Sequence, residues 1–216
     1  MPHPWQLIDS AFPTGSFAHS GGLEAAWQGG EIVNDAALDR FVRDSLWQAG
    51  HGALPLLSPA HRRPERLQEI DAIADAFLTN AVANRASRAQ GRAFAIACVR
   101  VWPSADLAGV EEVTRRGCGH AAPVMGAALR ALDVPLATAQ QMYLYGVARN
   151  ALAAAVRLGA VGPYRAQQLQ HESIGVQRAV IDACADLDVA DLAQTSPIVD
   201  VFQSVHDRLY SRLFQS

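Results

Sequence analysis

The spacing of apolar residues constrains the fold of this chain most strongly, because it repeats every three to four positions along nearly the whole length. Leu38, Phe41, Val42 and Leu46, for example, lie on one stripe of a helix that Asn34 is placed to cap. No six-residue run of alternating β-branched side chains occurs, as a half-buried strand would require. The pattern therefore predicts an all-α protein with almost no strand.

Glycine and proline residues set the expected helix boundaries. Gly50 and Gly52 are expected to break an early helix, and Pro64 is expected to occupy the first position of the next one. Pro135 and Pro163 are each expected to open a further long helix. Together these boundaries predict a single-domain bundle of roughly eight to ten helices.

Length and composition narrow the class of protein. A chain of 216 residues, 50% hydrophobic and 18% charged, can bury one core and is not a disordered chain. Its net charge of −3 argues against general nucleic-acid binding, which requires a basic face. The three cysteines are widely spaced, the N-terminus lacks a basic leader, and no apolar stretch reaches about 20 residues. We therefore expect a cytoplasmic protein that does not enter a membrane.

The end of the chain differs in character from the rest. Residues 1–190 are expected to form the helical domain, and residues 191–216 a C-terminal tail that follows an acidic stretch. Tyr210, Leu213 and Phe214 lie near its end, where we expect them to be exposed. Such a tail needs a surface to pack against, so it is predicted to bind a partner.

A stretch near the N-terminus, AFPTGSFAHSGGLEAAW, combines turn-forming residues with groups that could be catalytic. His19 lies beside Ser20, and Glu24 could supply the acid of a hydrolase-like set. Against this interpretation, no strand precedes the loop, as a nucleophile elbow requires. The structural alternative is that proline and glycine shape a turn, Ser20 caps the following helix and Phe17 anchors the loop.

Candidate metal ligands are few. Cys118 and His120 flank one glycine and offer a soft and a borderline ligand, whereas a closed site needs about four. His19 is a third candidate, and a plain helix connection is the alternative interpretation of the loop at Cys118. The chain contains no Walker loop, no GxGxxG after a strand and no DxDxDG loop. We therefore expect no bound nucleotide or calcium, and no tightly held cofactor.

Three arginines form a second feature of possible function. Arg85, Arg88 and Arg92 are separated by three and four positions, so they share one face of a predicted helix. Because guanidinium groups pair well with carboxylates and phosphates, this face could bind an acidic partner. A solvated helix face without a partner is the alternative.

The motif S-x-x-P-x-G-x-F-x-x-S-x-G-L-E falls on Ser10, Pro13, Gly15, Phe17, Ser20, Gly22, Leu23 and Glu24. With it, the stretches at 87–93, 157–169 and 196–214 make the chain resemble the urease accessory protein UreF family. Asp207 departs from the pattern, because the family often carries glutamate at this position. The segment at 51–64 matches poorly and is expected to be a variable loop.

The resemblance implies an all-α protein that is not an enzyme and tends to form homodimers. It further implies a complex with the accessory protein UreD, also called UreH, and with the GTPase UreG, which together deliver nickel to apo-urease. The C-terminal tail would pack on UreD. Nickel would be met only in transit, and whether His19 meets it is left open.

Twelve side chains are predicted to bind partners: Arg85, Arg88, Arg92, Arg157, Tyr164, Arg165, His206, Arg208, Tyr210, Arg212, Leu213 and Phe214. Truncation before Asp191 is expected to abolish UreD binding and to leave helicity nearly intact. Two other functions remain open. One is regulation of GTP hydrolysis in the partner GTPase through Arg88 or Arg92. The other is a small hydrolase that uses Ser20 and His19.

Overall fold

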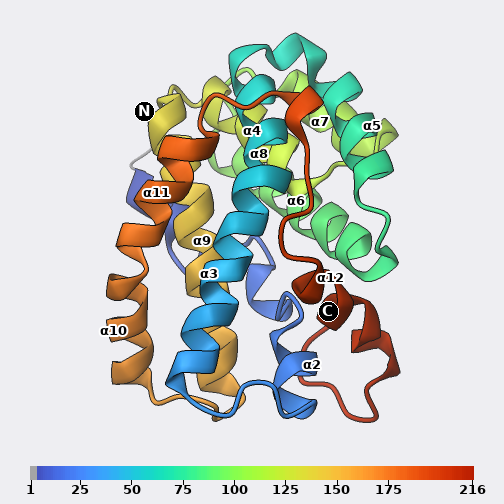
Figure 1. The fold of residues 1–216 in the computed structure, drawn as a ribbon. Helices are drawn as coiled ribbons and strands as arrows, with labels where there is room; N and C mark the ends of the chain where they lie inside the picture. Colours follow the sequence, from blue (N-terminus) through green and yellow to red (C-terminus); the bar gives the residue numbers. More distant parts are fainter. Residues whose placement is uncertain (1–3) are drawn as a thin grey trace.

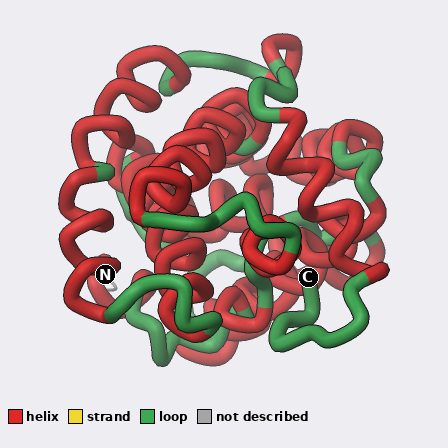
Figure 2. The backbone as a smooth tube through the Cα atoms, turned by 60° about the horizontal axis from the view of Figure 1, so that its bottom comes forward, coloured by secondary structure: helices red, strands yellow, loops and turns green. Residues whose placement is uncertain are grey.

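Helices make up the regular structure of residues 4–216, the part of the chain that the computed structural model describes (Figure 1). The α-helices are α1 (Pro4–Ile8), α2 (Leu23–Gln28), α3 (Asp35–Gly52), α4 (Leu54–Arg62), α5 (Leu67–Phe77), α6 (Ala81–Val101), α7 (Ala108–Arg116), α8 (Ala121–Ala131), α9 (Leu136–Arg157), α10 (Pro163–Glu172), α11 (Ile174–Cys184) and α12 (Pro197–Val205). Within residues 4–216 there is no strand, as Figure 2 shows. The all-α prediction is confirmed, although the described part of the chain forms twelve α-helices rather than eight to ten.

Several predicted helix boundaries are confirmed. The Asn34 side chain accepts a hydrogen bond from the Ala37 amide, 2.9 Å away, and so caps α3. Pro135 directly precedes α9, and Pro163 is the first residue of α10. The helix expected after Pro163 is in fact two helices, because the chain bends at Ser173 before α11 begins.

The segment at 51–64 is not a loop, and this prediction was wrong. It contains α4, in which all residues from Leu54 to His61 are buried. The helix packs against α8, and a Cβ atom at Gly126 of α8 would overlap the Leu57 carbonyl oxygen, so only glycine permits this approach (Figure 1). Two prolines, Pro55 in the first turn and Pro59 inside the helix, obscure α4 in the sequence, because proline usually interrupts a helix.

The expected break at Gly50 was also wrong. Helix α3 continues through Gly50 to Gly52. A Cβ atom at Gly50 would lie 2.5 Å from Cγ1 of Val180 and 3.1 Å from the Cys184 sulfur, both on α11. The glycine therefore lets α11 pack closely on α3 rather than ending the helix.

Two apolar clusters share the long helix α9. Ala139 and Met142, near its start, join a cluster built mainly by α4, α5, α6 and α8. Leu144 and Leu152, further along, join a second cluster with α2, α3, α10 and α11. Within residues 4–216, no helix combines the length and apolar character needed to cross a membrane.

Candidate functional site

The C-terminal residues fold back onto the N-terminal loop, and we call residues 15–24 and 206–216 together the terminal junction. The Ser20 amide and hydroxyl both donate to the Ser216 main-chain oxygen, at 2.5 and 3.0 Å. The Gln215 amide donates to the Ala18 carbonyl oxygen at 2.8 Å. The chain end therefore lies beside α2 and the motif loop, as the neighbouring C-terminus and α2 in Figure 1 show.

Glu24 holds the terminal junction together from within. Its side chain is almost fully buried, at 1% exposure, yet it has donors for both carboxylate oxygens. Oε1 accepts from the Leu213 amide at 2.6 Å, and Oε2 accepts from the Phe214 amide at 3.2 Å and lies 3.0 Å from Nε2 of His206. A buried carboxylate requires such partners, so folding of the end of the chain satisfies this group of α2.

The backbone of the motif loop confirms the predicted turn. Gly15, Gly21 and Gly22 adopt positive φ angles of 68°, 63° and 92°, which side chains other than glycine rarely adopt. A Cβ atom at Gly22 would also lie 3.0 Å from the Gln203 amide nitrogen of α12. The glycines therefore shape the loop and admit the C-terminal segment.

Two details predicted for this loop were wrong. Ser20 does not cap α2, because Gly22 is the N-cap residue and the Ser20 hydroxyl is bonded to Ser216 instead. Phe17 does not anchor the loop, since its side chain is 70% exposed. Ser20 therefore binds the C-terminal segment, and the Phe17 side chain remains open to solvent.

His19 and Ser20 do not form a catalytic pair. Nδ1 of His19 lies 2.6 Å from Oγ of Ser216, while Ser20 donates to the Ser216 main-chain oxygen. Burial lowers the pKa of His19 below its ordinary value, and the nearby His206 lowers it further. These side chains dock the chain terminus, which explains why the loop contains so many polar and turn-forming residues.

The C-terminal segment combines buried ends with an exposed middle. Phe214 and His206 are buried, at 5% and 0% exposure, so the expected exposure of Phe214 was wrong. The Arg157 guanidinium lies 4.3 Å from the centre of the Phe214 ring and donates to the Phe17 carbonyl oxygen. Between the buried ends, the exposed segment 208–213 includes four predicted partner-binding residues: Arg208, Tyr210, Arg212 and Leu213.

The arginine face of α6 is tied to the same C-terminal segment. The Arg85 guanidinium donates to both carboxylate oxygens of Asp207, at 2.9 and 2.8 Å, and Arg212 lies 3.5 Å from the same group. The hydrogen bonds from Arg85 hold the pKa of Asp207 below its usual range, and the charges of Arg85 and Arg212 add to this effect. Arg88 and Arg92 are half-buried, and within residues 4–216 neither forms an ion pair. The shorter aspartate at 207 therefore still reaches a cation.

Arg165 and Tyr164, also predicted to bind partners, lie at the start of α10. Arg165 pairs with Asp35 at 2.7 Å and with Glu172 at 2.8 Å, which joins α10 to α3. Tyr164 is 88% exposed and stays available to a partner. The two neighbours therefore differ in role, since one links helices and the other faces solvent.

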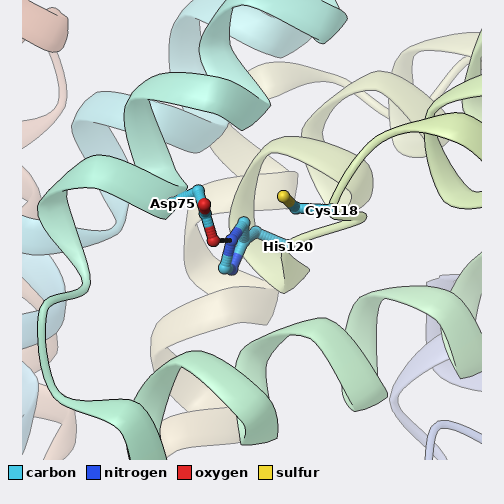
Figure 3. A group of neighbouring side chains, drawn as sticks. All are labelled: Asp75, Cys118 and His120. Carbon is cyan, nitrogen blue, oxygen red and sulfur yellow. Dashed lines mark hydrogen bonds and ion pairs between the residues drawn. The ribbon is translucent and has the colours of Figure 1, made fainter.

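Cys118 and His120 lie on the loop between α7 and α8, far from the terminal junction along the chain. Their loop is held by Asp71 of α5, a buried carboxylate that accepts hydrogen bonds from the amides of Cys118, Gly119 and His120 at 2.8, 3.0 and 2.7 Å. One turn further along α5, Asp75 lies 3.1 Å from Nε2 of His120 (Figure 3). The structure thus adds a carboxylate to the two predicted candidates.

The sequence interpretation missed Asp75, although its spacing of four from Asp71 places both carboxylates on one face of α5. Hydrogen bonds from Asn84 and His120 hold the pKa of Asp75 below its usual range. Burial raises the pKa of Cys118, and the charges of Asp75 and Asp71 add to this effect while Arg88 opposes it. His19 does not belong to this group of potential ligands.

A cavity of about 260 Å³ extends between α3, α6, α9 and α12. His19 and Ser216 of the terminal junction line it, and so do Ser87 and His120. The cavity therefore borders both the terminal junction and the loop of His120, which contain the metal-ligand candidates from the sequence.

The chain is similar to urease accessory proteins of plants and bacteria. Urease accessory protein F of Arabidopsis thaliana is 36% identical over 98% of this chain and 91% of its own length. Urease accessory protein F of Oryza sativa subsp. indica is 33% identical over 97% of this chain and 83% of its own length. Urease accessory protein UreF of Ruegeria pomeroyi is 29% identical over 98% of this chain and 94% of its own length.

These relatives define the class as accessory proteins of urease rather than enzymes. The UreF family model matches residues 32–174. The chain therefore belongs to the UreF family, and its role lies in urease maturation. The resemblance found in the sequence motifs is confirmed.

Proposed function

We propose that this chain is a cytoplasmic binding scaffold for nickel insertion into urease. In this role it links a UreG-type GTPase to a UreD/UreH-type accessory protein and apo-urease, and it acts as a homodimer. Nickel is the cargo of the assembly and is held by this chain at most in transit. Membership of the UreF family supports the proposal, as does the absence of a Ser20–His19 pair.

The exposed segment 208–213 is the observation that carries the proposal. Tyr210 is fully exposed and Leu213 is 53% exposed, although the segment lies between the buried residues His206 and Phe214. Glu24 holds the chain on both sides of this segment, through the His206 side chain before it and through the Leu213 and Phe214 amides at its end. Aromatic, arginine and apolar groups held in this way are typical of binding hot spots.

A point-variant experiment tests this assignment more sharply than truncation does. Removing residues after 190 would strip Glu24 of all three of its donors, so lost binding could reflect damage to the fold. We expect Tyr210→Ala combined with Leu213→Ala to weaken binding of the host's UreD/UreH-type protein at least tenfold. Light scattering after size exclusion and calorimetric titration would measure it.

Val33 supplies a matched control, since it is 74% exposed, apolar and outside the predicted interface. Val33→Ala should bind the partner as the unaltered chain does. Circular dichroism should show the same helicity for all three proteins. Unchanged partner affinity in the Tyr210/Leu213 double variant would overturn the assignment of the segment 208–213.

A further inference from the structure

We propose that Asp75, Cys118 and His120 form a three-ligand binding site for a divalent transition-metal ion. Their carboxylate, thiol and imidazole ligand atoms all lie within 4.8 Å of one another (Figure 3). A tetrahedral ion holds its ligand atoms about 3.5 Å apart, so closure around a metal needs only small side-chain adjustments. The proposal stands on this geometry and does not depend on the scaffold function.

The ligands are held in place by their neighbours. Asp71 fixes the backbone of all three residues from Cys118 to His120, and Gly119 adopts the positive φ of 72° that the loop requires. A Cβ atom at Gly91 of α6 would overlap the Gly119 carbonyl oxygen, so a glycine on α6 also admits the loop. The site therefore lies where α5, α6 and the loop between α7 and α8 meet, and not on a free surface.

Ser87 orients the imidazole. Its Oγ lies 3.1 Å from Nδ1 of His120 and accepts a hydrogen bond from the Ala121 amide at 3.1 Å. With Nδ1–H donating to this hydroxyl, an ion would replace the proton that Nε2 shares with Asp75 and would bind the lone pair of Nε2 and the carboxylate together. A second-sphere hydrogen bond of this kind is the usual partner of a metal-binding histidine.

The donor set indicates the class of metal. One thiolate and one imidazole favour borderline ions such as Zn²⁺, Ni²⁺ or Co²⁺ over Mg²⁺ and Ca²⁺, which prefer oxygen ligands. His120 is buried, whereas Asp75 and Cys118 are half-buried and give an ion access from solvent. Three protein ligands leave a fourth position open, so the ion should be exchangeable rather than structural.

Titration of the full-length protein with Co²⁺ tests the site. We expect one equivalent to bind, with a thiolate-to-cobalt charge-transfer band in the near ultraviolet. Cys118→Ser should abolish that band, and Asp75→Asn should weaken binding about tenfold or more while keeping the band. His171→Ala, which alters an exposed histidine of α10, is the control and should leave both unchanged.

Ser87→Ala tests independently whether the His120 imidazole is a ligand, because it removes the hydrogen-bond partner of His120 Nδ1 and leaves all three ligands in place. Its Co²⁺ affinity should fall about 10- to 100-fold with the charge-transfer band retained. Circular dichroism of each variant would show that the fold is kept. The proposal is overturned if the unaltered protein shows no thiolate band, or if the band persists in Cys118→Ser and so belongs to another cysteine.

Discussion

Glu24 and His206 share a hydrogen bond of 3.0 Å in the interior, although 182 positions separate them in the chain. Neither side chain is measurably open to solvent, with exposures of 1% and 0%. The same carboxylate binds the amides of Leu213 and Phe214, so one residue of the N-terminal motif fixes the whole C-terminal segment. The N-terminal turn and the exposed segment 208–213 thus form one structural unit.

Replacement of Glu24 by alanine should release this unit. Three donors, of which those of His206 and Phe214 are buried, would lose their acceptor, and breaking such a network costs about 3 kcal/mol of unfolding free energy. Urea denaturation would measure the loss, and hydrogen exchange should show the amides of residues 213–216 opening first. Glu31→Ala, at an exposed position, is the control. Unaltered exchange at 213–216 in Glu24→Ala would contradict this explanation.

Gly91→Ala should separate α6 from the Cys118–His120 loop. The added methyl group would overlap backbone atoms of Gly119 and His120, which cannot rotate away. We expect a loss of about 1–3 kcal/mol in unfolding free energy, measured by chemical denaturation.

Gly109→Ala is the matched control for this substitution. Gly109 also lies in a helix, α7, but a Cβ atom there meets nothing within 4 Å. Alanine at this position should be neutral or stabilise the protein by up to about 1 kcal/mol. Equal effects at the two positions would show that contact with the loop does not require glycine at 91.

Asp207→Asn tests whether Arg85 acts within its own chain. The Arg85–Asp207 pair is largely exposed, with side-chain exposures of 56% and 41%, so its loss should cost less than about 1 kcal/mol of stability. If Arg85 only positions the C-terminal segment, Arg85→Ala and Asp207→Asn should weaken partner binding equally. A double-mutant cycle on partner affinity would measure this. A larger effect of Arg85→Ala would instead indicate direct contact with the partner.

The sequence predicts the helices well because their signals are local. The cap at Asn34 and the prolines at 135 and 163 act on neighbouring backbone, so each could be placed from the sequence alone. Helix α4 escaped prediction because it contains Pro55 and Pro59, and proline usually interrupts a helix. Gly50 was misinterpreted for a related reason, since its role depends on Val180, which is distant in sequence.

The candidate sites also depend on contacts between residues that are distant in sequence. Cys118 and His120 are neighbours in sequence and could be paired, but Asp75 joins them only through the packing of α5 against the loop. Phe214 looked exposed because it is near the chain end, yet its burial depends on the docking of that end on Glu24. Residue type and spacing thus identified candidates, whereas partners across the fold decided their roles.

Acid should weaken the terminal junction through His19. Because burial and the nearby His206 lower the folded-state pKa of His19 below its ordinary 6.5, the folded protein binds its proton less readily than the unfolded chain. The contribution of His19 is therefore complete above pH 6.5 and is lost as the pH falls through the lowered value. His19→Asn should reduce the dependence of unfolding free energy on pH in that window.

Some dependence on pH should remain in this variant, because burial also lowers the pKa of His61. The comparison is therefore between slopes, measured by urea denaturation from neutral to mildly acidic pH. His171→Asn, on the exposed surface of α10, should leave the slope of the unaltered chain intact. A slope in His19→Asn equal to that of the unaltered chain would show that His19 gains no proton at the junction, and the contact between its Nδ1 and Ser216 would then not account for acid sensitivity.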